Sequence, residues 1–114
     1  MIVVRRGTVD DAAEVVRLRA LMLAAMGLDV GPATAPWRHD CAEAYRQQLA
    51  DDGFGAFVID GAAGKLAASA LGWVDRRLPG PGSDGRVGHL ANVCTDPAYR
   101  RRGLARAAVR AALE

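Results

Sequence analysis

The chain is poor in lysine, aromatic residues and cysteine, and each shortage narrows what it can do. Lys65 is the only lysine among 15 lysines and arginines, and the formal net charge is only +2. A charge this small does not by itself indicate a nucleic-acid partner, and an aromatic content of 5% offers few surfaces on which bases could stack. Cys41 and Cys94 form no pattern, so we expect reduced thiols and a cytoplasmic location.

Long apolar runs, internal repeats and low-complexity stretches are also missing from the sequence. No hydrophobic segment approaches the ~20 residues that span a bilayer, and residues 1–6 lack the apolar stretch of a signal peptide. We therefore expect no membrane partner. Hydrophobic residues make up 51% of the 114 residues, which predicts a single globular domain over residues 1–114.

Hydrophobic periodicity predicts a strand followed by two helices in the first half of the chain. Residues 2–5 form the strand. Thr8 caps the first helix, Asp11 completes an approximate capping box, and Gly27 ends the helix. The second helix is expected over residues 38–50. The apolar faces of the two helices carry Val15, Leu18, Met22 and Met26, and Ala42, Tyr45 and Leu49.

The second half of the chain predicts three strands and a final helix. Residues 61–64 supply the turn of a hairpin, and residues 76–86, with their prolines and glycines, form a loop. The fold class is therefore α/β, of the α+β type, with a sheet flanked by helices. The expected strands span residues 56–59, 66–74 and 87–95, and the helix spans residues 102–114 with Leu104, Ala108 and Ala111 buried.

The segment from Val93 to Arg106 is the most informative part of the sequence. An apolar strand runs into a turn at Pro97, and three arginines, Gly103 and an alanine-rich helix follow. Backbone N–H groups at a helix N-terminus favour an anion, and arginine side chains add bidentate phosphate contacts. Gly103 and Ala105 leave room for a phosphate to approach the backbone. The segment therefore predicts a pyrophosphate site.

The spacing Arg100-x-x-Gly103-x-Ala105 after Val93-x-Thr95 resembles motif A of the GCN5-related N-acetyltransferases. This resemblance implies the element order β-α-α-β-β-β-α and a mixed, mostly antiparallel sheet. It also implies an enzyme that transfers acetyl from acetyl-CoA to a primary amine by direct attack, without a metal. The cofactor-binding residues that it implies are Val93, Cys94, Thr95, Arg100, Arg101, Arg102, Gly103, Leu104, Ala105 and Arg106.

These residues have different expected roles. The side chains of Arg100 and Arg102 are expected near the pyrophosphate, whereas Arg101 and Arg106 contribute backbone N–H groups. By the resemblance, the main chain of residues 93–95 binds the pantetheine arm, and one N–H group there polarises the acetyl carbonyl. The alternatives are that each arginine is a solvated surface charge and that the glycine only starts a helix.

His89 is the candidate catalytic base. Counted back from the motif, it holds the position where histone acetyltransferases of this family carry a glutamate and arylalkylamine acetyltransferases a histidine. Imidazole titrates near neutrality, which suits removal of an ammonium proton; the alternative is a strand histidine without a role. Alternation along the strand places His89, Val93 and Thr95 on one face and Asn92 and Cys94 on the other. We expect Asn92 to make a structural hydrogen bond and the thiol to be buried rather than nucleophilic.

The acceptor is expected to be a small-molecule or peptide amine, and the sequence does not name it. By the resemblance, the region between the first two helices helps to form the acceptor site, and Trp37 either lines it or anchors the core. His39 and Tyr45 lie in or near the same region. Asp75 and the loop over residues 76–86 are further candidates for the border of this site.

The resemblance covers the whole chain but not the whole family fold. The sequence stops at Glu114, before the family's fifth strand, fourth helix and closing hairpin. We therefore expect strand 87–95 to have an unpaired edge, which a truncated product would expose and a homodimer would cover. Size-exclusion chromatography tests this expectation.

Two other functions remain open from the sequence. One is a non-catalytic acyl-CoA-binding or interaction module, because the expected C-terminal part of the fold is missing. The other is a nucleic-acid binder built on Arg100, Arg101 and Arg102, although the charge is local and few aromatic residues accompany it. Titration with acetyl-CoA and with DNA separates these alternatives.

Overall fold

A computed structural model describes residues 1–113 and contains one four-stranded sheet in the order β1-β2-β3-β4. Each of the three strand pairings is antiparallel. The strands are β1 (Arg5–Arg6), β2 (Phe54–Asp60), β3 (Leu66–Arg76) and β4 (Arg86–Thr95). The helices are α1 (Ala12–Ala25), α2 (Pro36–Gln48) and α3 (Leu104–Leu113), with the short 3-10 helices η1 (Val9–Asp11) and η2 (Pro97–Tyr99). The predicted fold class and element order are confirmed.

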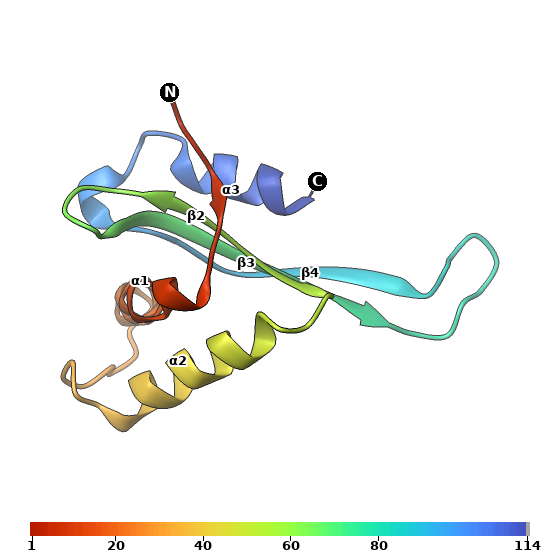
Figure 1. The fold of residues 1–114 in the computed structure, drawn as a ribbon, viewed down its shortest axis with the longest axis horizontal. Helices are drawn as coiled ribbons and strands as arrows, with labels where there is room; N and C mark the ends of the chain where they lie inside the picture. The colour runs from red at the N-terminus through yellow and green to blue at the C-terminus, as the bar shows by residue number, and fades with distance from the viewer. Residues whose placement is uncertain (114) are drawn as a thin grey trace.

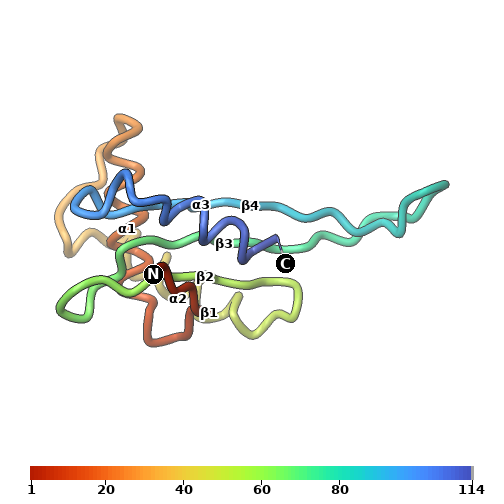
Figure 2. The backbone as a smooth tube through the Cα atoms, turned by 90° about the horizontal axis from the view of Figure 1, so that it is seen from above, coloured from red at the N-terminus to blue at the C-terminus, as the bar shows by residue number. Residues whose placement is uncertain are grey.

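The helices form two layers, because α1 and α2 cover one face of the sheet and α3 covers the other (Figure 1). Apolar residues fill both interfaces, so the sheet is the centre of the core. Strands β3 and β4 continue past the helices as an arm (Figure 2). Buried on the first side are Ala12, Val15, Leu18, Tyr45, Ala56, Val58, Leu66 and Cys94; buried on the second are Ile59, Ala67, Ala68, Ala70, Leu104 and Ala108.

Several predicted boundaries were wrong by a few residues. The first strand is not residues 2–5, since only Arg5 and Arg6 pair with β2. The Thr8–Asp11 capping contact is present, with the Thr8 N–H donating to the carboxylate at 2.8 Å. It caps η1, however, and the α-helix begins only at Ala12. Helix α2 starts earlier than predicted, because Pro36 fits the first helical position.

Of the remaining helix boundaries, the end of α1 agrees with the prediction and the start of α3 does not. Gly27, with φ +91°, follows the end of α1 as predicted. Met26 is 67% exposed and is not part of the apolar face. Helix α3 begins at Leu104, two residues later than expected, and its predicted end at Glu114 lies outside the described residues.

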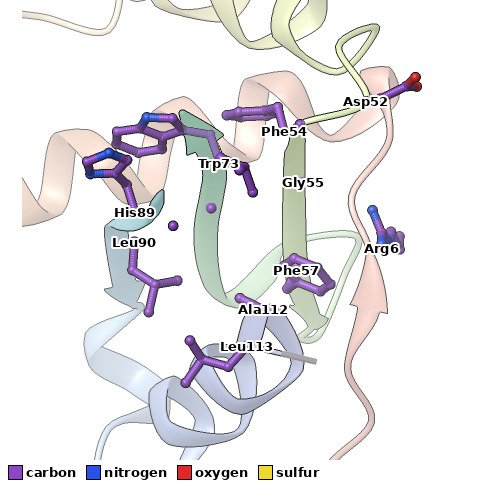
Figure 3. A pocket seen from close by; sticks show the side chains of 14 residues that line it. Arg6, Asp52, Phe54, Gly55, Phe57, Trp73, His89, Leu90, Ala112 and Leu113 are labelled. Carbon is purple, nitrogen blue, oxygen red and sulfur yellow. The ribbon is translucent and has the colours of Figure 1, made fainter. Parts of the chain in front are cut away.

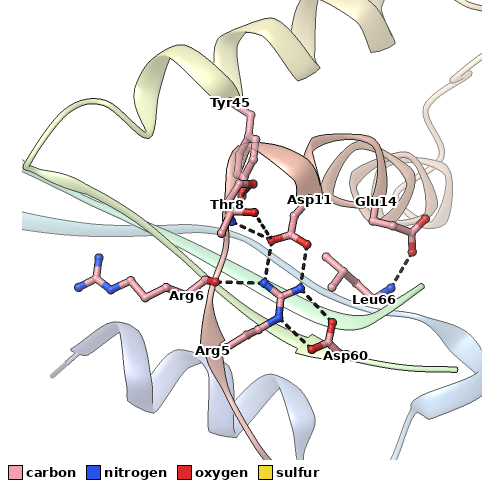
Figure 4. Close-up of polar contacts among 8 residues, drawn as sticks. All are labelled: Arg5, Arg6, Thr8, Asp11, Glu14, Tyr45, Asp60 and Leu66. Carbon is pink, nitrogen blue, oxygen red and sulfur yellow. Dashed lines mark hydrogen bonds and ion pairs between the residues drawn. The ribbon is translucent and has the colours of Figure 1, made fainter. Parts of the chain in front are cut away.

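Arg5 ties β1 to both the η1 turn and β2 (Figure 4). Its guanidinium donates to Asp11 at 2.8 Å and to Asp60 at 2.8 Å. These hydrogen bonds hold the pKa of both carboxyls below their ordinary range. The negative charges of Asp11 and Asp60 are therefore both compensated by Arg5 within the fold.

Arg17 makes the equivalent connection from α1. It pairs with Glu14 at 2.8 Å and with Asp96 at 2.7 Å, and it donates to the Leu66 carbonyl at 3.0 Å. The Leu66 N–H donates back to Glu14 at 2.7 Å (Figure 4). Burial works to raise the pKa of Glu14, but the hydrogen bonds from Arg17 and Leu66 lower it overall. Arg17 therefore joins α1 to β3 and to the turn that follows β4.

A β-bulge interrupts the pairing of β3 with β4. Ser69 pairs with Cys94 and Leu71 pairs with Ala91, so one β3 residue stands opposite two β4 residues. The extra β4 residue takes a left-handed conformation at Asn92, where φ is +52°. An extra residue reverses the alternation of side chains along the rest of a strand.

The bulge makes the predicted distribution of side chains on β4 wrong. His89 stands opposite Trp73, whereas the Cys94 sulfur lies 3.5 Å from the sulfur of Met22 on α1. Asn92 also faces α1, where it accepts a hydrogen bond from Arg19 at 3.1 Å. His89, Asn92 and Cys94 therefore share the sheet face covered by α1 and α2, and the expected separation of His89 from the other two is not observed.

Candidate active site

The turn between β4 and α3 is shaped by Asp96. One carboxylate oxygen accepts from the Ala98 N–H at 2.9 Å, and the other pairs with Arg17 at 2.7 Å. The hydrogen bond from the Ala98 N–H, and then that from Arg17, hold the pKa of Asp96 below its ordinary range. The carboxylate thus stays charged at neutral pH and fixes the start of the loop to α1.

The loop after this turn presents a series of free backbone donors. Arg101 and Gly103 both have left-handed backbones, with φ +66° and +74°. Among the described residues, the N–H groups of residues 101–106 have no hydrogen-bond acceptor. Donors left free at a helix N-terminus attract anions, and left-handed residues next to the helix bring further N–H groups to the same place.

Gly103 opens the space in front of these donors. A Cβ atom built on it would meet no atom within 4 Å. The side chains of Arg100, Arg101, Arg102 and Arg106 are exposed, and within residues 1–113 none of them pairs with a carboxylate. Free N–H groups, open space and unpaired guanidinium groups fit a pyrophosphate.

A hollow of about 240 Å³ lies between α1 and the end of β4. It brings together four of the predicted cofactor-binding residues. Arg100 is the only charged residue among those that line it, and the outer edge of β4 has no strand partner within residues 1–113. The lining residues are Val93, Cys94, Thr95 and Arg100, with Leu18, Leu21, Met22 and Ala25 of α1 and Met26, which follows this helix.

The other predicted cofactor-binding residues lie around the same loop but not in this hollow. The guanidinium of Arg102 sits 5.4 Å from the centre of the Tyr99 ring and lines a separate hollow beside the N-terminal residues. Gly103 and Arg106 line a third hollow along α3. The Leu104 side chain is buried, so only its backbone is available to a ligand.

Cys94 is buried and is not built as a nucleophile. Burial raises the pKa of its thiol to about 11. At neutral pH the group is therefore a protonated thiol, which is a poor nucleophile. This agrees with the expectation of a packed thiol.

His89 is held between two residues of β3. Its ring stacks on Trp73 with centroids 5.0 Å apart and planes 15° from parallel. Its Nε2 lies 2.8 Å from an Asp75 oxygen, at ion-pair distance. That nitrogen is buried and has no hydrogen-bond partner among the described residues, so the contact with Asp75 lacks hydrogen-bond geometry. Asp75, expected only at the border of the acceptor site, thus touches the candidate base.

A larger hollow, of about 340 Å³, lies beside His89 (Figure 3). Gly55 and Gly72 pair with each other at its base. Figure 3 shows His89 and Trp73 on one side of the hollow, and Arg6 at the opposite end. No predicted cofactor-binding residue lines this hollow, so the smaller hollow is the better candidate for the cofactor.

The aromatic residues of the α1–α2 region are mainly structural. Tyr45 is 4% exposed, and its hydroxyl donates to the Thr8 carbonyl at 3.1 Å. The indole N–H of Trp37 donates to the Val30 carbonyl at 2.8 Å, which anchors the loop between the helices. His39 is exposed. The expected hydrogen bond of Asn92 is confirmed, and its donor, Arg19, was not singled out by the sequence.

Comparison with known proteins gives consistent results. The profile of the acetyltransferase (GNAT) family matches residues 22–114, and no curated protein matches the sequence. A predicted acetyltransferase from Clostridium acetobutylicum, crystallised with acetyl-CoA, superposes with a TM-score of 0.80 at 19% identity, covering 99% of this chain and 71% of its own.

Two further solved structures show the same arrangement. A GCN5-related N-acetyltransferase from Ralstonia eutropha has a TM-score of 0.78 at 23% identity, with 99% of this chain and 74% of that chain covered. Glucosamine-6-phosphate N-acetyltransferase from Arabidopsis thaliana has a TM-score of 0.73 at 17% identity, with coverages of 99% and 72%. At such identities the likeness establishes the fold. None of the helices within residues 1–113 has the length and apolar character needed to cross a bilayer.

Proposed function

Because the chain belongs to the acetyltransferase (GNAT) family, we propose that it transfers the acetyl group of acetyl-CoA to the nitrogen of a primary amine. The observation that carries this proposal is the run of unpaired N–H groups over residues 101–106, in front of the open space at Gly103. A pyrophosphate is the ligand chemistry that such a set of donors suits best.

The chain's own residues divide the binding of acetyl-CoA among them. The N–H groups of residues 101–106 and the Arg100 side chain take the pyrophosphate. The hollow between α1 and β4 takes the pantetheine arm, with main-chain groups of residues 93–95 at its side. The cosubstrate supplies an acetyl thioester, whose carbonyl carbon is open to attack by a nitrogen nucleophile.

His89 is the proposed base. Asp75 lies against Nε2, so we assign the ring proton to that nitrogen and proton acceptance to Nδ1. The substrate ammonium gives one proton to Nδ1, and the free amine then forms a bond to the acetyl carbon as the C–S bond breaks. The nitrogen loses its second proton to the solvent as the amide forms, and the departing thiolate takes a proton from the solvent, so the products are the N-acetyl amine and CoA. A positioned base of this kind contributes about 10²–10⁴ in rate.

The test is a calorimetric titration of the chain with acetyl-CoA and, separately, with duplex DNA. It is followed by measurement of thiol release with a panel of primary amines. We expect saturable binding of acetyl-CoA, no binding of DNA, and amine-dependent thiol release. Binding of acetyl-CoA without turnover on any amine would instead favour a non-catalytic acyl-CoA module. Binding of DNA alone would overturn the proposal.

A further inference from the structure

The loop that presents the free N–H groups is strained, and its own backbone does little to hold it. Arg101 has a left-handed backbone with φ +66°, which is unfavourable for a residue that carries a Cβ atom. The N–H groups of Arg101, Arg102 and Gly103 donate to no acceptor within residues 1–113. Strained residues persist where the surrounding structure holds them, so a side chain must supply the support that the backbone does not.

Arg102 makes a contact that supplies this support. Its guanidinium lies 5.4 Å from the centre of the Tyr99 ring, which is within the range of a cation–π contact. In the chain it stands between the two left-handed residues of the loop, Arg101 and Gly103. Within residues 1–113, neither Arg100 nor Arg101 has an aromatic partner. The Arg102 side chain therefore links the strained part of the loop to the Tyr99 ring.

Tyr99 is in turn fixed by the turn between β2 and β3. Its hydroxyl oxygen accepts a hydrogen bond from the Ala62 N–H at 2.8 Å. A Cβ atom built on Gly61 would lie only 2.9 Å from the same oxygen, so this glycine leaves the space that the phenol ring occupies. At its other end, the Tyr99 N–H donates to the Asp96 carbonyl at 2.8 Å. The ring is thus held from a part of the chain far from the loop in sequence.

We propose that Tyr99 and Arg102 position the donors of the pyrophosphate site. The ring, held by the β2–β3 turn, fixes the Arg102 side chain and with it the left-handed backbone of residues 101–103, so the free N–H groups are ordered before the ligand arrives. Donors that are ordered in advance bind more tightly, because less entropy is lost on binding. Arg102 therefore acts through Tyr99, and this role takes the place of the phosphate contact expected from the sequence. The inference rests on the proposed function and names two positioning residues for it.

The first experiment is a double-mutant cycle in which calorimetry measures the affinity for acetyl-CoA. The variants are Tyr99→Leu, Arg102→Gln and the two combined. Each single change should weaken binding, and both break the same contact. The combined variant should therefore bind about threefold or more tightly than the product of the two single losses predicts. Additive losses would show that Arg102 acts on the ligand independently of Tyr99, and they would overturn the inference.

A second cycle is the matched control for charge. Arg101→Gln removes the same positive charge from the same loop, but Arg101 has no aromatic partner within residues 1–113. Any long-range attraction between the loop and an anionic ligand enters both cycles alike. Arg101→Gln and Tyr99→Leu should therefore give additive losses. Equal coupling in the two cycles would overturn the inference, because the coupling would then not depend on the contact with the ring.

The second experiment reaches Tyr99 from the β2–β3 turn. Gly61→Ala places a methyl group where the phenol oxygen lies, so the ring must move, and the affinity for acetyl-CoA should fall about threefold. The control is Gly64→Ala in the same turn, where the φ of +74° makes alanine strained. It should lower the melting temperature at least as much and yet retain the affinity. Full affinity in Gly61→Ala would overturn the inference.

The outcomes separate this inference from the proposed function. If the original chain does not bind acetyl-CoA, the proposed function fails, and NMR relaxation of the amides of residues 101–103 in the free chain judges the inference. Those amides should be more mobile in Tyr99→Leu than in the original chain, and equal mobility would overturn the inference. If acetyl transfer occurs and the first cycle is additive, the inference fails and the proposed function stands. Thermal melting verifies that each variant is folded, and a cycle of Gly61→Ala with Arg102→Gln replaces the first one if Tyr99→Leu does not fold.

Discussion

The polar groups around Arg5 and Arg17 differ sharply from those around Arg19 and His89. On the first side, every carboxylate near an arginine is paired, and the pairs link β1, β2, α1 and the turn after β4. On the second side, donors of Asn92 and Arg38 are buried without a partner among the described residues. Both regions are polar and partly buried, yet only the first is satisfied by the chain itself.

Under the proposed function, this difference separates groups that hold the fold from groups that act on a ligand. Removing one partner of a buried ion pair leaves the other charge without a counter-charge where water solvates it poorly, so the free energy of unfolding falls. Removing a group that has no partner in the free protein costs the fold little, and the loss appears only in binding or catalysis. Each prediction below assigns a residue to one side of this comparison.

The largest expected effect is on catalysis, at the unsatisfied side. His89→Ala should lower kcat by about 100-fold, because the ammonium proton loses its acceptor. It should also remove the acid limb of the pH–rate profile, while the melting temperature and the affinity for acetyl-CoA stay near their original values. An unchanged pH–rate profile would exclude His89 from the mechanism.

Asp75→Asn serves as the matched variant for this prediction. The substitution keeps the shape of the side chain that lies 2.8 Å from the ring but removes its negative charge. We expect a smaller fall in kcat than for His89→Ala, because the ring keeps its Nδ1 acceptor and loses only the charge beside Nε2. A purely structural role for Asp75 would lower the melting temperature and leave kcat unchanged.

The next effect is on stability, at the satisfied side. Arg17→Gln leaves Glu14 and Asp96 without their counter-charge and should lower the free energy of unfolding by about 2–3 kcal/mol. Arg19→Gln removes no ion pair and should change it by less than about 1 kcal/mol. Chemical denaturation of both variants measures the difference. Equal losses would erase the distinction between the two regions.

The same pairs determine the response to acid. Arginine partners and backbone donors hold the pKa of Asp11, Asp60 and Asp96 below its ordinary range. A carboxyl whose folded-state pKa is depressed stabilises the protein fully above its unfolded value, about 4, and loses that contribution as the pH falls through the folded value. Unfolding free energy should therefore decline below about pH 4, and less steeply in Arg17→Gln than in the original chain.

The sequence predicts the conformation of the loop after β4 well because its signals are local. Pro97 sets a turn, Gly103 allows a left-handed residue, and the arginines stand beside both in the chain. The family motif is likewise a short, continuous stretch of sequence. The resemblance that it carries was therefore enough to predict the order of the helices and strands. What the pattern does not supply is the direction of each side chain, and Arg102 turns toward Tyr99 instead of the hollow that holds Arg100.

The bulge in β4 and the enclosed arginines beside it were not predicted, because these features depend on contacts between distant parts of the chain. The bulge at Asn92 arises from the register of β4 against β3, and no residue type near it signals the extra residue. Arg19 and Arg38 look like other surface arginines in the sequence. Only the packing of α1, α2 and β4 shows which arginines are partly buried and which carboxylates are already paired with another arginine.

A pair of glycines extends the comparison to the backbone. Gly103 and Gly64 have the same φ, +74°, and a Cβ atom on either would meet no atom within 4 Å. Alanine at either position costs a similar strain of about 1 kcal/mol or more. Gly103→Ala should also weaken acetyl-CoA binding by about tenfold, because the methyl group enters the space assigned to the pyrophosphate and the free N–H groups shift. Gly64→Ala, in the β2–β3 turn, should leave that affinity unchanged.

The smallest expected effect is at Cys94, which lines the hollow between α1 and β4 but is packed in the core. The thiol is 4% exposed, packs against Met22 and has its pKa raised by burial to about 11. Cys94→Ala should therefore cost about 1 kcal/mol of stability from the small cavity and change kcat little. In the original chain, iodoacetamide should alkylate the half-buried Cys41 before Cys94, as read by peptide mass spectrometry. Rapid alkylation of Cys94, or a large fall in kcat on its replacement, would place this thiol among the groups that act on the substrate, because a residue that only packs in the core gives neither result.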